Sequence, residues 1–507
     1  MGNIDQKRIA KNTLMLYIRM GILMLVNFYT SRVVLDSLGE VDNGLYGTVA
    51  GIVMMFAFMN STMATACQRF FAIEMGRDRN EELKRIFSLC VIVFFAIAII
   101  VVILSETAGL WLLFKKINND GRFHAALVVF QCSIISFLFK IIMTPYQGMV
   151  VIKEKMKVYS YISVFEAFGN LAIAIAISRS EQDRLILYGI LMMAVNIAVT
   201  LYYIVYCSAF WSECRFKFYW NKEKFMEIFS FAGWNMIGPL TNTCKTQGIT
   251  ILINIFFGNA VVSARTMAQK VFTSVQQFSE NFIIALKPQM IKSYSAGDKA
   301  SMFKLMFQGS KFSYFLLFVV SFPLMLETAP VLDFWLKDVP EYTVMFTRLV
   351  LLNALIDVFA APLATTMQAY GNIRNYQLIC GPFLLLILPV SWILFKLGFA
   401  VQSIFYVSIV ICALAIPLRL LIIRHYLNLN LSDYLKYTVI PVLSVTAVSV
   451  PIPLAMEMLM EPSLFKFFAV VGVSIICVAG AAYGLGMTKT ERKHLNEQIM
   501  NKIKRHS

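Results

Sequence analysis

The sequence has few charged residues and lacks the motifs on which many enzymes depend. Only 15% of its 507 residues are charged, against about 25% in a typical soluble domain. It contains neither a GxxxxGK[ST] loop for ATP nor an HExxH metal motif, and its four histidines do not have metal-ligand spacing. The composition excludes an ordinary soluble protein, and nothing in the motifs indicates an enzyme, a bound metal or an organic cofactor.

Paired cysteines are also absent. The chain has nine cysteines but no CxxC motif, and most of them lie inside apolar runs. A disulfide framework or a zinc site is therefore not expected, and the cysteines are predicted to be packing residues.

Apolar residues, by contrast, are abundant and come in long runs. They make up 59% of the chain, and 42 of them are Phe. The runs are roughly 20 residues long, enough for a helix to cross a hydrocarbon core of about 30 Å. The sequence therefore predicts an all-α polytopic membrane protein with about 14 transmembrane helices. Their expected cores are 13–34, 46–66, 87–110, 123–143, 159–177, 185–207, 229–257, 260–287, 312–334, 344–369, 376–397, 401–423, 437–456 and 463–483.

The distribution of Lys and Arg predicts the orientation in the membrane. The formal net charge is +16, and in a membrane protein such an excess indicates cytoplasmic loops rather than nucleic-acid binding. With the N-terminus inside, most loop cations lie in the inside segments. The start, MGNIDQKRIAKN, lacks the features of a cleaved signal, so the first helix is expected to be retained. We predict a multi-pass protein of the bacterial inner membrane with both termini in the cytoplasm.

An internal repeat divides the chain. At an offset of 221 residues Asn60 matches Asn281, Gln68 matches Gln289 and Gln147 matches Gln368. The pattern predicts two parallel six-helix lobes, residues 1–210 and 211–430, followed by two more helices and a basic tail over 431–507. Two such lobes usually form an alternating-access transporter with its site between them.

Several polar residues fall deep inside the apolar runs and are candidates for substrate binding. On the eighth predicted helix a narrow polar stripe includes Arg265, Gln269, Gln276 and Glu280, with Lys270 nearby. An isolated cation in lipid is costly, so each deep cation should contact water, a partner or a substrate. The deep cations outnumber Glu280, which predicts an anionic substrate. The complete set of expected substrate-binding residues is Arg19, Asn27, Asn242, Lys245, Arg265, Gln269, Lys270, Gln276 and Glu280.

Each of these residues also has a purely structural interpretation. Intramembrane charges often neutralise one another, as Arg32 would with Asp36, Glu280 with Lys287, and Lys140 with Glu166. Asp357 on the tenth predicted helix either binds a coupling proton or sodium ion, or neutralises a cation such as Arg348. For Asp357 we favour the structural interpretation.

The N-terminal segment resembles a known family. The residues LGEVDNGLYG and the following ACQRFFAIEMGR look like the start of polysaccharide flippases of the Wzx type, which belong to the multidrug/oligosaccharidyl-lipid/polysaccharide (MOP, MATE-like) superfamily. The resemblance implies translocation of undecaprenyl-pyrophosphate-linked oligosaccharides for O-antigen, capsule or exopolysaccharide synthesis. It also implies a cationic central cavity, in which Arg19, Lys245, Arg265 and Lys270 occupy suitable places. A polysaccharide polymerase or export machinery would be a partner.

Three alternatives stay open from the sequence. A peptidoglycan lipid-precursor flippase would share the lipid pyrophosphate and the need for cations. A MATE-type drug or cation antiporter would be expected to carry a carboxylate within the first or seventh helix, where this chain has only Asp36 near one end. A membrane enzyme such as a polymerase would need a larger external loop.

Overall fold

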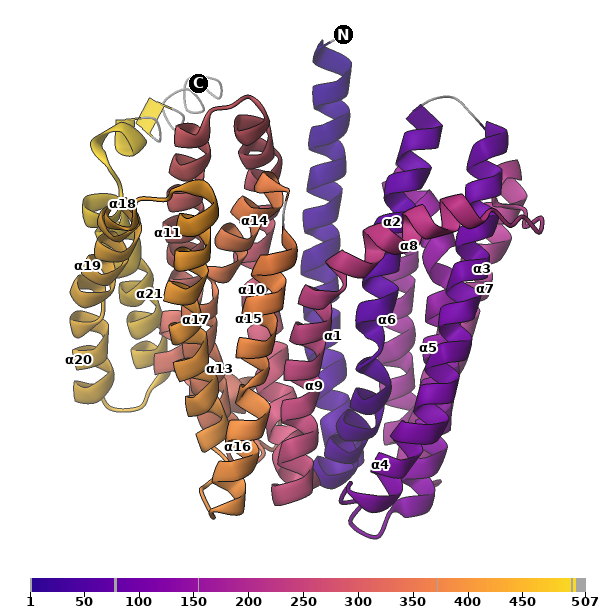
Figure 1. The fold of residues 1–507 in the computed structure, drawn as a ribbon. Helices are drawn as coiled ribbons and strands as arrows, with labels where there is room; N and C mark the ends of the chain where they lie inside the picture. The colour runs from indigo at the N-terminus through magenta and orange to yellow at the C-terminus, as the bar shows by residue number, and fades with distance from the viewer. Residues whose placement is uncertain (1, 77–79, 154, 372, 494–495, 498–507) are drawn as a thin grey trace. The chain divides into compact units, whose positions relative to one another are not determined.

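The computed structural model describes residues 2–76, 80–153, 155–371, 373–493 and 496–497. Every regular element in these ranges is helical (Figure 1). By length and composition, ten helices could cross a membrane, and a pair bent by 48°, Gly21–Met54 with Ala57–Met75, makes an eleventh if it is counted as one span. This confirms the predicted all-α polytopic membrane fold.

The chain forms two compact units. The first contains Met1–Met267, Trp335–Tyr342 and Leu388–Val401, and the second contains the remaining described segments. The helices of the first unit are α1 (Gly2–Met54), α2 (Ala57–Gly76), α3 (Asn80–Leu104), η1 (Ser105–Gly109), α4 (Leu110–Lys115), α5 (Phe123–Ile152), α6 (Met156–Ser178), α7 (Arg184–Phe210), η2 (Ser212–Cys214), α8 (Lys222–Asn235), α9 (Ile237–Phe257) and the start of α10 (Asn259–Ser295).

The second unit begins within α10, after Met267. It continues with α11 (Lys299–Leu326), α12 (Thr328–Trp335), α13 (Thr343–Asp357), α14 (Ala360–Tyr370), α15 (Ile373–Leu385), α16 (Ile387–Lys396), α17 (Ser403–Leu427), α18 (Leu431–Tyr434), η3 (Leu435–Val439), α19 (Ile440–Ser449), α20 (Pro451–Leu459), α21 (Leu464–Ala481) and η4 (Ala482–Gly486). The last residue of α12 and all of α16 after Ile387 belong to the first unit.

Several predicted helices are interrupted where glycine or proline disfavours a straight helix. Within α1, Gly39 adopts φ 74° and ψ 176°, so the chain turns there between the first two expected spans. The helix expected over 229–257 divides at Met236 into α8 and α9, two residues before Gly238-Pro239. Pro451 begins α20 after a break at Val450.

A buried apolar core holds the first unit together. It includes large side chains with no exposed surface, among them Leu45, Phe71, Phe87 and Phe130, and α5 packs against both α3 and α7. Burying an aromatic side chain of this size stabilises the fold by about 1.5–3 kcal/mol. These contacts make the unit a scaffold on which polar groups can be placed.

Side-chain amides and charges connect the turns at one end of the first unit, around the buried Asn259. The Asn259 side-chain amide donates to Asn118 O and to Asp120 Oδ2, both at 2.9 Å. Arg122 bridges Asp42 at 2.9 Å and Asp183 at 2.8 Å. These hydrogen bonds and ion pairs hold together four turns that are distant in sequence. Each polar side chain thereby has a hydrogen-bonding or charged partner.

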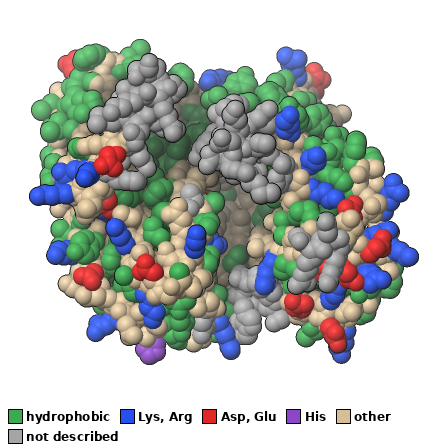
Figure 2. Space-filling view, turned by 90° about the horizontal axis from the view of Figure 1, so that it is seen from above, with side chains coloured by type: hydrophobic (Ala, Val, Ile, Leu, Met, Phe, Trp, Pro, Cys, Tyr) green, Lys and Arg blue, Asp and Glu red, His purple; other side chains and the backbone are tan. Residues whose placement is uncertain are grey.

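At the other end of the first unit, α8 runs across the direction of the neighbouring helices (Figure 1). Asn221 caps it by accepting a hydrogen bond from Lys224 N at 3.0 Å, and Lys224 Nζ lies 2.5 Å from Glu82. On the face viewed from above in Figure 2, Lys and Arg side chains are spread widely, with fewer Asp and Glu.

Candidate functional site

The helices α9 and α10 carry most of the predicted site residues, and neither is among the ten apolar candidate spans. Asn242 and Lys245 lie on α9, and Arg265, Gln269, Lys270, Gln276 and Glu280 lie on α10. Because both helices carry polar side chains, neither is suited to be surrounded by lipid on every side. A helix of this kind in a membrane protein normally faces other protein or a hydrated path.

Arg265 connects these two helices. Its side chain is buried, and its guanidinium donates to Thr250 Oγ1 and, at 2.9 Å, to Thr246 O, both on α9. The hairpin turn at Gly258 brings these residues together, and its φ of 85° favours glycine. Arg265 therefore positions α10 against α9, while contact with a substrate stays a prediction for this residue.

The α9 residues differ in exposure. Asn242 is exposed and Lys245 is half-buried. No carboxylate occurs anywhere in α9. The cation at Lys245 therefore belongs to a helix with no acidic residue of its own.

In the second unit the stripe continues along α10. Gln269, Lys270 and Gln276 are half-buried and Glu280 is exposed. Gln276 Nε2 donates to Glu280 Oε1 at 2.9 Å. The partner of Glu280 in the structure is thus the amide one turn before it, rather than the expected Lys287.

The predicted residues of α1 are less fully described. Arg19 lies in α1, but its side chain is outside the described residues. Asn27 is exposed, and its carbonyl oxygen accepts a hydrogen bond from Ser31 at 2.7 Å. Asp36, near the outer end of the first predicted span, lies 3.1 Å from Lys337 Nζ.

Asp357 lies beside a buried arginine. Its Oδ1 is 3.9 Å from Arg419, whose side chain is 8% exposed, and Arg348 instead donates to Leu326 O and Thr328. Arg419 is 62 residues farther along the chain, so the sequence alone did not identify it. This geometry supports the structural interpretation of Asp357, with Arg419 as the cation it neutralises.

We expect Asp357→Asn to lower the melting temperature without changing the dependence of transport on protons or sodium. The substitution leaves Arg419 without its counter-charge, at a cost of about 1–3 kcal/mol, less than for a fully buried pair. Asp333→Asn, at an exposed position in the same unit, is the control. Loss of ion dependence in a variant with an unchanged melting temperature would instead assign Asp357 to coupling.

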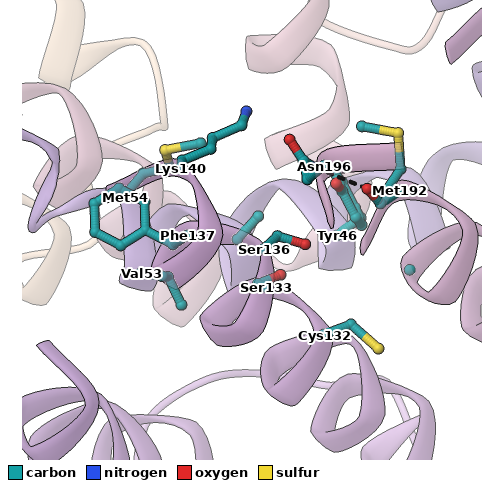
Figure 3. Close-up of a pocket in the computed structure, with 12 residues that line it drawn as sticks. Tyr46, Val53, Met54, Cys132, Ser133, Ser136, Phe137, Lys140, Met192 and Asn196 are labelled. Carbon is teal, nitrogen blue, oxygen red and sulfur yellow. Dashed lines mark hydrogen bonds between the residues drawn. The ribbon is translucent and has the colours of Figure 1, made fainter. Parts of the chain in front are cut away.

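Sequence reasoning missed a cavity in the first unit, with a mostly apolar wall that also carries a few polar side chains. It lies between α1, α5 and α7, has a volume of about 100 Å³, and is lined by residues that include Tyr46, Ser133, Ser136, Lys140 and Asn196. Figure 3 shows the α5 residues following one another along their helix, with Asn196 on another. The spacing of Ser133, Ser136 and Lys140, one helical face, was the available signal.

Metal ligands and cysteines are the remaining groups that could form a functional site. The described residues contain no group of three or more His, Cys, Asp and Glu side chains that could hold a metal ion. All nine cysteines are free, and seven of them are buried. Cys244 and Cys477 are half-buried.

By sequence, the chain matches no described protein family and no curated protein. Its fold, however, is similar to solved structures. The lipid II flippase MurJ in an inward closed conformation matches with a TM-score of 0.69 and 11% identity, over 93% of this chain and 98% of that one.

Two multidrug transporters also match. An inward-facing MATE family transporter of the MOP superfamily gives a TM-score of 0.67 at 12% identity, over 83% of this chain and 99% of that one. The MATE multidrug transporter DinF-BH, in a complex with a ligand, gives 0.62 at 14% identity, over 84% and 97%. At these identities the likeness concerns the fold, and the chain has the fold that these transporters of the MOP superfamily share.

Proposed function

We propose that the protein is a flippase that moves undecaprenyl-pyrophosphate-linked oligosaccharide repeat units from the cytoplasmic to the periplasmic leaflet for surface polysaccharide synthesis. The observation that carries the proposal is the pair of polar helices α9 and α10, which bear Lys245, Arg265 and Lys270 while α9 has no carboxylate. Cations in a membrane protein favour an anionic substrate and disfavour organic cations. The likeness to a lipid II flippase supports the same substrate class.

Each group in the site would have a distinct role. A cation about 4 Å from a phosphate gains about 4 kcal/mol at an effective dielectric constant of 20, so Arg19, Lys245 and Lys270 would bind the pyrophosphate. Arg265 would orient α10 and contribute positive charge. The amides of Asn27, Asn242, Gln269 and Gln276 would hydrogen-bond to sugar hydroxyls, and Glu280 would accept hydrogen bonds from them.

Transport would follow alternating access of the two predicted lobes, with head-group binding shifting the equilibrium between inward-open and outward-open states. A proton or sodium gradient, the membrane potential or removal of the product would drive it. We place the protein in the bacterial inner membrane with both termini in the cytoplasm, in agreement with the spread of Lys and Arg in Figure 2. A polymerase or export complex would take up the product.

A peptidoglycan lipid-precursor flippase is the second candidate, favoured by the match to MurJ. The two candidates differ only in the sugar and peptide attached to the lipid pyrophosphate. Leaflet transfer of fluorescent undecaprenyl-pyrophosphate oligosaccharide and of fluorescent lipid II in the same proteoliposomes separates them. The proposal predicts faster transfer of the oligosaccharide, and faster transfer of lipid II would establish the second candidate.

We expect Lys245→Gln to reduce lipid transfer about 10-fold or more without lowering the melting temperature. The substitution removes the positive charge of a half-buried residue but keeps its hydrogen-bonding capacity, and a 10-fold change corresponds to about 1.4 kcal/mol. Lys245→Arg, which keeps the charge, is the control and should retain most of the activity. Equal transfer by Lys245→Gln and the wild type would remove this residue from the site.

A further inference from the structure

The cavity of the first unit contains hydrogen-bond donors that the fold does not use. On the same helices, Thr144 and Thr200 donate to the carbonyl oxygens one turn before them, at 2.9 and 2.8 Å. The hydroxyls of Ser133 and Ser136 make no such bond within the described part of the chain. Unused hydroxyls at a cavity wall are free to bind an occupant.

The cavity also contains one uncompensated charge. Lys140 is the only charged residue among the twelve that line it, and none of the twelve is acidic. The expected pairing of Lys140 with Glu166 does not occur, and the Lys140 ammonium has no ion pair among the described residues. An ammonium in the middle of a membrane-spanning helix is costly unless an anion or water accompanies it.

The second unit carries a carboxylate at the helix position equivalent to Ser136, although the cation beside it, Arg419, lies on α17 and Lys140 itself corresponds to Ala361. The 221-residue offset pairs Ser136 with Asp357, and it pairs Thr144 with Thr365, whose hydroxyls both donate to the carbonyl oxygen one turn earlier at 2.9 Å. In the second unit, Asp357 supplies the carboxylate beside Arg419. In the first unit the equivalent position is a serine, so a cation is present without a built-in anion.

We propose that this cavity binds a small monovalent anion, chloride in physiological salt, between the Lys140 ammonium and the hydroxyls of Ser133 and Ser136. The bound ion takes the place that the Asp357 carboxylate has in the second unit. A halide ion accepts hydrogen bonds and donates none, so its binding site needs hydrogen-bond donors. The cavity wall supplies the Lys140 ammonium and the unused serine hydroxyls. Asn196 already donates its amide to Met192 O at 2.8 Å and limits the cavity on the α7 side.

The test measures thermal unfolding of the purified full-length protein in sodium chloride and in sodium gluconate at equal ionic strength. Gluconate is too large for the cavity. We expect chloride to raise the melting temperature of the wild type saturably, by about 2–4 °C. Lys140→Met should lose this response, and Lys157→Met, at an exposed position, should keep it.

Ser136→Asp provides a second variant that does not depend on removing the lysine. A carboxylate at this position imitates Asp357, so the variant should be insensitive to chloride and more stable than the wild type in gluconate. Equal melting temperatures of the wild type in the two salts would overturn the proposal. A chloride response retained by folded Lys140→Met or by Ser136→Asp would overturn it as well.

Discussion

Gly44→Ala is expected to prevent recovery of folded protein. A Cβ added at residue 44 would overlap the backbone carbonyl oxygen of Asn259. It would also lie only 2.6 Å from the carbonyl carbon of the same residue. That backbone cannot retreat easily, because the Asn259 side chain is hydrogen-bonded to Asn118 and Asp120. The expected loss of stability exceeds about 4 kcal/mol, the range of overpacked or disrupted cores. Yield of monodisperse protein and its melting temperature measure the effect.

Gly21→Ala is the matched control on the same helix. Nothing lies within 4 Å of a Cβ added at Gly21. Alanine is favoured over glycine inside a helix by about 0.8–1 kcal/mol, so this variant should be as stable as the wild type or slightly more stable. Normal yield and melting temperature of Gly44→Ala would show that α1 does not approach the α9–α10 turn as closely as described.

Glu491→Gln is expected to destabilise the second unit by about 3–5 kcal/mol. Glu491 Oε2 lies 2.6 Å from Lys311 Nζ, and the Lys311 side chain is 3% exposed. Gln308 also donates to Glu491, at 2.8 Å. Removing the carboxylate leaves a buried ammonium without its counter-charge, which is the costly way to break such a pair. Thermal unfolding of the variant, with the exposed Glu497→Gln as control, measures the loss.

Removing both charges should restore much of the stability. Lys311→Met combined with Glu491→Gln replaces the buried ammonium by an apolar side chain, and such replacements are often nearly neutral. A double variant no more stable than Glu491→Gln alone would contradict the ion-pair explanation.

Acid should weaken the same contact. Burial opposes ionisation of Glu491 and is the largest single influence, but the hydrogen bonds from Lys311, Thr488 N and Gln308 and the charge of Lys311 together outweigh it and hold the pKa of Glu491 below its ordinary value of 4.5. Because the folded-state pKa is lowered, this stabilisation is present above the ordinary value and is lost as the pH falls through the folded-state value. Glu491→Gln should lack this part of the acid sensitivity of the wild type.

The fold was largely predictable because apolar runs and helix breakers act locally. The runs gave the expected spans, and the interruption at Met236 lies two residues before Gly238-Pro239, a pair that disfavours a straight helix. The breaks at Val358 and Leu386 were not predicted, although each lies just before a proline, Pro362 or Pro389, which cannot donate a helical hydrogen bond. The lobe boundaries at 210 and 430 stay predictions.

The site was predictable only as a set of polar positions. Helical periodicity identified the α10 stripe, but it could not show that Arg265 bonds to Thr246 and Thr250 across the hairpin. The partner of Asp357 is equally non-local. Lys140 was assigned a partner on charge alone, and side-chain packing decided otherwise. Pairing of charges is a tertiary property that spacing along one helix does not determine.

Leaflet transfer in proteoliposomes tests the central claim most directly. A fluorescent undecaprenyl-pyrophosphate oligosaccharide and a fluorescent organic cation are offered to the same vesicles, with Lys245→Gln measured in parallel. We predict transfer of the lipid, no accumulation of the cation, and loss of lipid transfer in the variant. Transport of the cation without transfer of the lipid would contradict the account, because a cationic site cannot favour a cationic substrate.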